Sequence, residues 1–584
     1  MLSTARYLPA VGLLLLAVTT NWAAENPVPS EPFVAATDQT VLESWRNPDP
    51  AALQRWRDMR FGMFIHWGPV SLTGHEIGWS RGAQTPIEEY DKLYQQFNPA
   101  KFNADEWVAV AKAAGMKYIV FTTKHHDGFC MFDTKQTEFN VMRSPFGRDV
   151  TKELAEACRR GGIAFGTYHS VCDWHHPDFP RTSPGGKVIR EKSDIAAYRS
   201  YLRAQVKEII TQYGPLSTMW FDVPQEFDQA EGWENVRLCR TLQPDILVND
   251  RAGGGVGDYS TPEQRVGGFT IDRPWETCMT ICRQWSWKPD DTMKTLPECL
   301  QTLIRTAGGD GNLLFNVGPM ATGEIEPRQV ERLKEMGAWL EKYGESVYGT
   351  RGGPYKPAKH VVSTRKGATI YLHIFAWPSE VLVLPALPAK VLQSSVLTGG
   401  SATVTQSAAG VEITVPEADR RDIDTIVAIT LDKPALDIAP LVVSSLGQSL
   451  AEGKKAVASH VYQKNSHYAA AMAVDGDPET RWATDASVGP CWLEVDLGKP
   501  ETFDRVLIDE CVEWGARVRA FELQSKEGDE WKTFSSGKAV GPNREVKFNP
   551  VTARCVRLNI TEGQGGPTIF EFQLFPPATP KPAP

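Results

Sequence analysis

The sequence predicts a multidomain chain that begins with a TIM barrel of the (β/α)8 type and continues with two β-sandwiches, the second of jelly-roll form. Three observations lead to this prediction. A chain of 584 residues is too long for a single hydrophobic core. Between residues 45 and 345, strand-like apolar runs alternate with amphipathic helical patterns, as parallel β/α units require. After residue 346, apolar residues alternate with polar ones, which is typical of antiparallel sheets.

Six strand-like runs can be followed in the predicted barrel, which we place at residues 25–345. They are FGMFIHW (61–67), KYIVFTTK (117–124), IAFGTYHS (163–170), STMWFDV (217–223), ILVNDR (246–251) and NLLFNVGP (312–319). Helical patterns separate them, among others at 104–115, 150–162 and 193–214. A doubly wound open sheet is the alternative, and it is disfavoured because no glycine-rich nucleotide loop follows the first strand.

Polar side chains stand at the carboxyl ends of these runs. In a parallel barrel all these ends open onto one mouth, where packing alone would favour apolar residues. The sequence therefore predicts a functional site there, built from His66, His125, His126, His169, Asp222, Asp250 and Arg251.

The rest of the chain is predicted to be β-structure. Residues 346–435 form the first sandwich and 436–455 a turn-rich linker. Residues 456–576 form the second sandwich, and the proline-rich tail 577–584 is extended.

The N-terminus carries one arginine before the apolar stretch 11–18, and small residues follow at Ala23 and Ala24. This pattern predicts a signal peptide over residues 1–24, because the stretch is too short to span a membrane, and a lone N-terminal anchor is the alternative. We therefore expect an exported protein, periplasmic or secreted, that is not integral to the membrane after signal removal. The net charge of −9 disfavours nucleic acid as a partner.

Asp222 is the strongest candidate for chemistry, since it ends the apolar run MWFD and would be buried there. A salt bridge to Arg251 or to a lysine of the barrel is the structural alternative. Glycoside hydrolysis needs a second carboxyl group across the scissile bond. The segment after the fifth strand, which we expect to be a loop, offers four: Asp258, Glu263, Asp272 and Glu276.

Five motifs in this order, FGMFIHWG, TTKHHDGF, MWFDV, PWETCMTI with WSW, and LLFNVGPMATGEI, resemble the α-L-fucosidases of glycoside hydrolase family 29. The resemblance runs from about residue 45 to 432. It implies a retaining mechanism with Asp222 as the nucleophile and no cofactor for catalysis. Spacing from the nucleophile favours Glu263 as the acid/base, with Glu276 as the rival. Trp275 and Cys278 beside Glu276 look like strand core, so a buried structural glutamate is the alternative for Glu276.

The resemblance also implies a fucose pocket that contains His66, His125, His126 and Trp220, with Arg251 contacting the sugar or holding Asp222 ionised. A metal role for the paired histidines is disfavoured because no further ligand stands at helical spacing beside them.

The chain departs from the family pattern at several pocket positions. Glu76 and Trp79, adjacent in the family, are three residues apart here, and both are expected to contact the sugar. His169 takes the place expected for a tyrosine after the third strand, and Val223 the place of a glycine after the nucleophile. These departures leave the preferred leaving group open, and Trp174 with its neighbouring histidines is a candidate for that side of the site.

The segment AVDGDPETRWATD with the closing IFEFQLF resembles the discoidin, or coagulation-factor type C, fold, which carbohydrate-binding modules of family 32 share. This resemblance implies a possible structural calcium ion held by Asp475, Asp477, Thr480 and Glu571.

Together these observations predict an exo-acting retaining α-L-fucosidase that acts on fucosylated glycans. Two alternatives stay open: a non-catalytic fucose-binding protein, and a hydrolase of the same fold for a related sugar such as an α-L-galactoside.

Overall fold

The computed structural model describes residues 45–180, 192–377, 379–408, 410–443, 449–476, 480–512 and 515–577. The predicted signal peptide, most of the predicted proline-rich tail and Asp477 lie outside the described residues.

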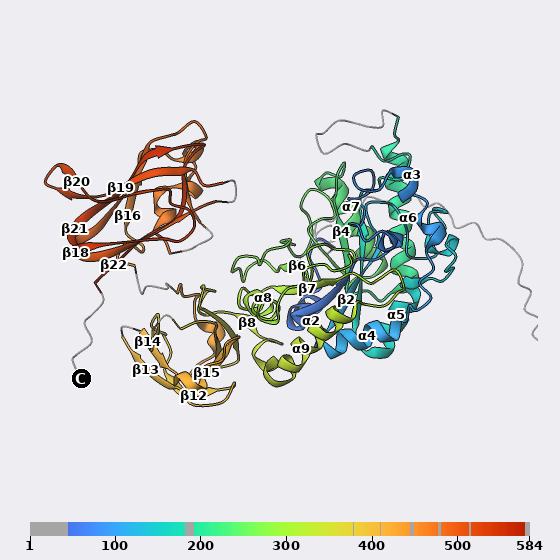
Figure 1. The fold of residues 1–584 in the computed structure, drawn as a ribbon, viewed down its shortest axis with the longest axis horizontal. Coiled ribbons are helices and arrows are strands. Elements are labelled where there is room, and N and C mark those ends of the chain that lie inside the picture. The colour runs from blue at the N-terminus through green and yellow to red at the C-terminus, as the bar shows by residue number, and fades with distance from the viewer. Residues whose placement is uncertain are drawn as a thin grey trace, which may run out of the picture. The chain divides into compact units, whose positions relative to one another are not determined.

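The first part of the described chain is a parallel barrel-like sheet (Figure 1). Its strands lie in the order β5-β4-β3-β2-β1-β7-β6. Their bounds are β1 (Phe61–Ile65), β2 (Tyr118–Lys124), β3 (Ala164–Ser170), β4 (Thr218–Asp222), β5 (Leu247–Val248), β6 (Glu276–Thr280) and β7 (Asn312–Val317). The first five and the last are the six predicted runs, each trimmed at its ends.

Strand β6 was not among the predicted strands, because the stretch after the fifth strand was interpreted as one long loop. That interpretation is wrong for residues 276–280, which pair in parallel with β7 and are fully buried. The threonines and the glutamate of ETCMT hide the apolar pattern by which a buried strand is recognised.

The gap between β5 and β6 is closed by the irregular segment 259–263. Tyr259 bridges to Asn249 at the end of β5, while Ser260 and Glu263 bridge to Trp275 and Cys278 on the β6 side. All three bridges are parallel, so the segment completes the ring of strands without forming a regular strand itself. Glu263 is thereby carried into the wall of the barrel.

Helices connect the strands and cover the sheet. They are α2 (Pro50–Met59), α3 (Ile87–Tyr90), α4 (Ala104–Ala113), α5 (Val150–Gly161), α6 (Ile195–Tyr213), α7 (Gln229–Leu242), α8 (Leu296–Gly308) and α9 (Pro327–Tyr343). Asn or Asp side chains cap the N-termini of α4, α5, α6 and α7, and α8 begins with a capping box from Thr295 and Glu298. These caps satisfy backbone N–H groups that the first helical turn leaves without partners.

The remaining sheets are antiparallel, as predicted. One region has the sheets β12-β15-β10-β9-β8 and β11-β14-β13, and the last has β17-β22-β18-β21-β19-β20 with β16 paired to β18. The strands of the first region are β8 (Arg351–Gly352), β9 (Val361–Lys366), β10 (Thr369–Ile374), β11 (Leu382–Leu384), β12 (Val391–Val396), β13 (Thr403–Ser407), β14 (Gly410–Thr414) and β15 (Thr425–Leu431). Those of the last are β16 (Lys455–Ala458), β17 (Trp482–Ala483), β18 (Cys491–Glu510), β19 (Val518–Glu527), β20 (Glu530–Lys538), β21 (Arg544–Gly563) and β22 (Thr568–Phe575).

Each of these two β-regions has its own apolar core, one around Ile370, Leu372 and Val427 and one around Leu493, Val506 and Leu558. Among the described residues, no helix is both long and apolar enough to cross a membrane.

Candidate active site

A cavity of about 70 Å³ lies at the carboxyl ends of the barrel strands. Eight of the ten residues predicted for catalysis or sugar binding line it, and Glu76 and His169 do not. The lining residues are Phe64, His66, Trp79, His125, His126, Tyr168, Trp220, Asp222, Val223, Arg251, Glu263, Cys278 and Trp285.

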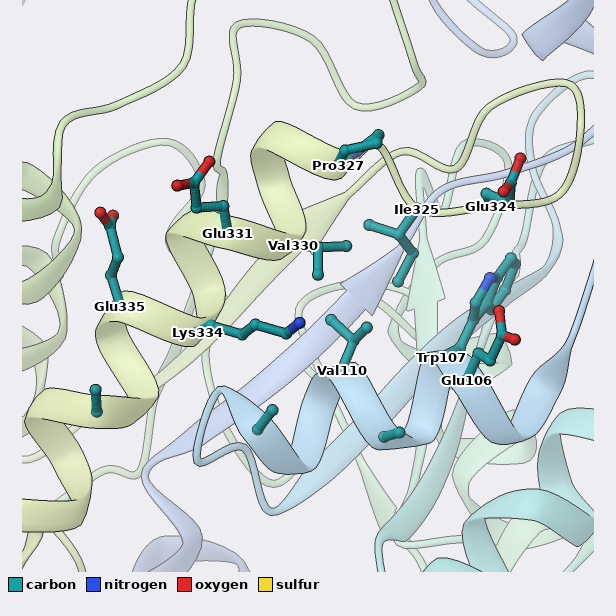
Figure 2. Close-up of a pocket in the computed structure, with 13 residues that line it drawn as sticks. Glu106, Trp107, Val110, Glu324, Ile325, Pro327, Val330, Glu331, Lys334 and Glu335 are labelled. Atoms are coloured by element: carbon teal, nitrogen blue, oxygen red, sulfur yellow. The ribbon is translucent and has the colours of Figure 1, made fainter.

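A much larger hollow, of about 940 Å³, lies elsewhere, between α4 and α9 (Figure 2). Its floor is apolar, with Trp107, Val110 and Ile325, and glutamates stand around it. None of the predicted site residues lines this hollow. Volume alone therefore does not identify the site of chemistry, and the convergence of titratable groups in the smaller cavity does.

The register between β3 and β4 decides which side chains face the cavity. Tyr168 is paired with Trp220 and Ser170 with Asp222. Neighbours in register point to the same face of a sheet, so Tyr168 faces inward beside Trp220 while His169 points outward. The prediction that His169 contacts the sugar is therefore not supported: its ring is fully buried behind the sheet, 2.9 Å from Thr123 Oγ1 and 3.2 Å from Gln205 Oε1.

Asp222 is buried and held through both carboxylate oxygens. Oδ1 accepts a hydrogen bond from Arg251 Nη1 at 2.7 Å, and Oδ2 accepts one from the hydroxyl of Tyr168 at 2.7 Å. His126 Nε2 lies 3.7 Å from Oδ2. Burial by itself would raise the pKa of Asp222, but the charge of Arg251 and the hydrogen bonds from Arg251 and Tyr168 outweigh it and leave this pKa below its ordinary value. The carboxylate is thus kept ionised.

The phenol of Tyr168 keeps its proton, because burial and the neighbouring Asp222 carboxylate raise its pKa well above the ordinary value. It is therefore a permanent hydrogen-bond donor to the carboxylate. The two indispensable conditions for a buried anion, a countercharge and hydrogen-bond donors, are both met here.

Arg251 joins the two predicted catalytic carboxylates. The same Nη1 atom that donates to Asp222 also lies 3.1 Å from Glu263 Oε2. Its Nε and Nη2 donate to Oγ1 and O of Thr261, so the guanidinium also anchors the segment that carries Glu263. The Cζ atom of Arg251 lies over the ring of Trp220, 4.8 Å from the ring centroid. The Glu263 side chain is 44% exposed, whereas that of Asp222 is 12% exposed, so Glu263 is the more open of the two to water.

The histidines of the cavity are neutral. Burial lowers the pKa of His66 to about 3 and that of His126 to about 4, and it lowers the pKa of His125 well below the ordinary value. Neutral imidazoles donate at one nitrogen and accept at the other, which suits sugar hydroxyls.

The tautomer of His66 follows from its hydrogen-bond network. Asn316 Nδ2 donates to the carbonyl of Trp285 at 2.7 Å, which orients the amide. Asn316 Oδ1 must then accept from His66 Nδ1, 2.7 Å away. His66 Nε2 is left as an acceptor.

Glu276 lies in the barrel core and has no exposed surface. Its carboxylate accepts hydrogen bonds from Trp220 Nε1 at 3.0 Å and from the hydroxyl of Tyr118. Burial raises its pKa to about 7. It does not line the cavity, so the geometry does not support the rival interpretation in which Glu276 is the acid/base.

Glu76 holds two loops together. Its carboxylate accepts hydrogen bonds from the backbone N–H groups of Trp285 at 2.9 Å, Ser286 at 3.1 Å and Ile77 at 3.0 Å. The expectation that Glu76 contacts the sugar is not supported, because these bonds engage both of its oxygens outside the cavity wall. Trp79, three residues on, does line the cavity and is 52% exposed.

Sequence reasoning missed Tyr168, Trp285, Phe64 and Cys278 as lining residues. Tyr168 faces inward together with Trp220 and Asp222 of β4, and this follows from the register between the two strands, which no pattern in the sequence indicates. Trp285 belongs to the WSW motif, and its ring centroid lies 4.7 Å from that of His66.

The predicted calcium ligands of the last region are only partly described. Thr480 Oγ1 lies 2.8 Å from both carboxylate oxygens of Asp475, Glu571 is buried on β22, and Asp477 lies outside the described residues. In the described part of the chain no group of three or more His, Cys, Asp or Glu residues could hold a metal ion. Carboxylate and hydroxyl oxygens are nevertheless donors of the kind that Ca²⁺ takes.

Comparison with known proteins finds two families whose profiles match the chain. The profile of the family described as Alpha-L-fucosidase matches residues 31–345, and that of the F5/8 type C domain matches residues 455–572.

Among curated proteins, the tissue α-L-fucosidase of Mus musculus is 29% identical over 391 residues, which cover 60% of this chain and 84% of the relative. The structure of α-L-fucosidase isoenzyme 1 from Paenibacillus thiaminolyticus is similar with a TM-score of 0.61 at 32% identity, covering 65% of this chain and 99% of that one. A trapped covalent intermediate of a family 29 α-L-fucosidase from Bacteroides thetaiotaomicron, in complex with 2-fluoro-fucosyl fluoride, is 28% identical with a TM-score of 0.59, covering 66% and 97%.

These matches confirm the predicted barrel and the discoidin-like last domain. Because the family profile spans more than half of the sequence and the relatives agree with it, the chain belongs to the α-L-fucosidase family, a family of glycoside hydrolases.

Proposed function

We propose that this enzyme is an exo-acting, retaining α-L-fucosidase that removes terminal α-L-fucosyl residues from glycans, with Asp222 as the nucleophile and Glu263 as the acid/base. The observation that carries the proposal is the shared contact of both carboxylates with Arg251 Nη1, at 2.7 and 3.1 Å. Asp222 Oδ1 and Glu263 Oε2 can be no farther apart than the sum of these distances. Two carboxylates bridged by one nitrogen atom support the short separation of retaining enzymes, ~5–5.5 Å, rather than the ~6.5–9.5 Å at which inverting enzymes seat a water molecule.

In the first step, an oxygen of the ionised Asp222 attacks the anomeric carbon of the fucosyl residue. The bond from this carbon to the glycosidic oxygen breaks, and the protonated Glu263 gives its proton to the departing oxygen. The lowered pKa of Asp222 suits a nucleophile, and the exposed position of Glu263 gives it access to the water molecule of the second step.

In the second step, the ionised Glu263 takes a proton from a water molecule, whose oxygen bonds to the anomeric carbon. The bond to Asp222 breaks, and the carboxylate is restored. The sum of both steps is one glycoside and one water converted to fucose and the free alcohol, with retention at the anomeric carbon. A covalent intermediate has been trapped in the related enzyme from Bacteroides thetaiotaomicron, which supports the same course here.

The rest of the cavity is suited to bind one fucose unit. His66, His125 and His126 are neutral donors and acceptors for hydroxyl groups, while Phe64, Trp220 and Trp285 offer apolar ring surface. A methyl-bearing sugar such as fucose needs both kinds of contact.

The test uses azide as a replacement nucleophile. With 4-nitrophenyl α-L-fucoside, Asp222→Ala should lose nearly all turnover, and added azide should restore nitrophenol release with formation of β-fucosyl azide. Glu263→Ala with azide should instead give α-fucosyl azide, because the covalent intermediate still forms. An Asp222→Ala enzyme that keeps wild-type turnover, or a wild type that releases β-fucose first, would refute the assignment.

We also propose that the F5/8 type C domain takes a structural Ca²⁺ at Asp475 and Thr480, with Asp477 and Glu571 as further ligands. Calcium should then raise the unfolding temperature of this domain relative to a chelator, and Asp475→Ala should abolish the difference. Export of the protein stays a prediction of its N-terminal pattern.

A further inference from the structure

We propose that Trp79 and Trp174 form a platform that binds a sugar of the glycan beyond the fucosyl residue, a neutral pyranose packed against indole. This inference rests on the proposed function and deepens it. In an exo-acting enzyme only the terminal fucose enters the cavity. Any sugar bound outside the cavity wall therefore belongs to the leaving group.

The two indoles adjoin the mouth of the cavity. Trp79 lines the cavity and yet is 52% exposed, and every other tryptophan in the described ranges is more buried. Trp174 meets it edge to face, with ring centroids 5.1 Å apart and an angle of 74°. Both rings also contact His126, at 5.4 and 5.3 Å, so the aromatic surface continues directly from the fucose pocket outward.

The platform is held rigidly by the loops that follow β1 and β3. Gly78 has φ +67°, and a Cβ atom there would lie 2.6 Å from His125 Nδ1, so the backbone approaches the histidine pair as closely as only glycine allows. The backbone N–H of Trp174 donates to the carbonyl of His126 at 2.7 Å.

Arg81 ties the two loops together. It donates to both carboxylate oxygens of Asp91, at 2.6 and 2.7 Å, and to the carbonyl of Trp174 at 3.4 Å. Its charge is thereby neutralised, so the platform presents aromatic surface with no net charge of its own. A surface fixed before binding loses little entropy when a ligand packs on it.

Aromatic faces bury the apolar C–H surface of a ring without needing a charged partner. A neutral hexose or N-acetylhexosamine fits this surface, and Arg81, a cation beside the platform in the part of the chain that the structure describes, is already paired with Asp91. We infer that the enzyme prefers fucose attached to such a pyranose over fucose on a small aglycone.

The experiment compares two kinds of substrate in wild type and Trp174→Ala. α-L-Fucosyl fluoride has no sugar in its leaving group, and a set of fucosyl disaccharides of different linkage to galactose or N-acetylglucosamine has one. For the best disaccharide, we expect Trp174→Ala to lower kcat/KM by roughly tenfold more than it lowers kcat/KM for the fluoride. Trp174→Phe should restore most of this difference, and it keeps the test available if the alanine variant does not fold.

The matched control is Trp339→Ala on α9, which should leave the ratio of the two kcat/KM values at its wild-type level. Equal losses on both substrates with Trp174→Ala, or no loss on any disaccharide, would overturn the platform. A wild type that does not hydrolyse even the fluoride would refute the proposed function itself, and with it the platform. If the wild type hydrolyses the fluoride but Trp174→Ala leaves the ratio of the two kcat/KM values unchanged, the platform alone is refuted.

Discussion

Replacing Arg251 with methionine removes a side chain that contacts both proposed catalytic carboxylates. Methionine keeps a long apolar stem against Trp220 but supplies no charge and no donor. Asp222 then retains the hydroxyl of Tyr168 and the neutral His126 as neighbours and loses its nearest cation, 2.7 Å away. Asp222 stays buried in the variant. Burial, which raises the pKa of Asp222, is then no longer outweighed by the charge of Arg251.

The size of the effect follows from the contact. An arginine in direct contact lowers the pKa of an aspartate by about 1–3 units. The acidic limb of the kcat/KM profile reports ionisation of the nucleophile in the free enzyme, so we expect this limb to move up by about 1–3 pH units in Arg251→Met. The variant should also lose activity at all pH values, since Thr261 and the segment bearing Glu263 lose their anchor.

The assay is hydrolysis of 4-nitrophenyl α-L-fucoside between about pH 3 and pH 8, with a thermal unfolding curve at each pH to establish that the enzyme is folded. Arg251→Lys is the matched control: it keeps the charge but not the bridging geometry, so its activity should fall while its acidic limb stays near that of the wild type. A folded Arg251→Met enzyme whose acidic limb coincides with the wild-type limb would show that Arg251 does not set the ionisation of the nucleophile.

Three further predictions concern the surroundings of the site. Tyr168→Phe removes a hydrogen bond to the Asp222 carboxylate and should lower kcat/KM by roughly tenfold or more, with a small upward move of the acidic limb; an unchanged pH profile would argue against this role. Glu276 has its pKa raised by burial from 4.5 to about 7, so the folded state binds its proton more tightly than the unfolded state does. The unfolding free energy of the wild type minus that of Glu276→Gln should therefore fall by roughly 2–4 kcal/mol as the pH rises from about 4.5 to about 7, measured by urea unfolding at each pH; a constant difference would contradict the raised pKa. Gly78→Ala places a methyl group against His125 at positive φ and should cost roughly 1–3 kcal/mol of stability together with activity, whereas Gly367→Ala, also at positive φ but with nothing within 4 Å, should leave activity intact.

Much of the barrel could be predicted, because its strands are apolar runs that end in a polar residue. Asp222 illustrates the reason: a carboxylate at the carboxyl end of a buried parallel strand is expected at the mouth of the barrel. The histidines after β1 and β2 followed the same rule. The rule failed one strand later, at β3, where the sequence gives no sign of whether Tyr168 or His169 faces inward. That choice is set by the register with β4, which is a tertiary property.

The wrong prediction for Glu76 has a different cause: irregular backbone shows no periodic pattern of apolar residues from which the direction of a side chain could be predicted. Glu76 and Trp79 lie in a turn-rich loop, and only the contacts with Trp285 and Ser286 show that the glutamate holds the loop rather than the ligand. The strand β6 was concealed by its own polar residues, although the strand-core character of Trp275 and Cys278 already offered a buried structural glutamate as the alternative for Glu276. Glu263 was chosen correctly as a cavity residue from its spacing, although nothing in the sequence indicates that its segment completes the ring.

The two carboxylates of the site have unequal mechanical support. Asp222 ends a regular strand whose position is fixed by β3 and β5, whereas Glu263 stands on the irregular closing segment, held by isolated bridges and by Arg251. Insertions or deletions in the stretch between β5 and β6 can therefore move the proposed proton donor without disturbing the proposed nucleophile. Within such a scaffold the identity of the sugar attacked and the identity of the group released can change independently of one another in evolution.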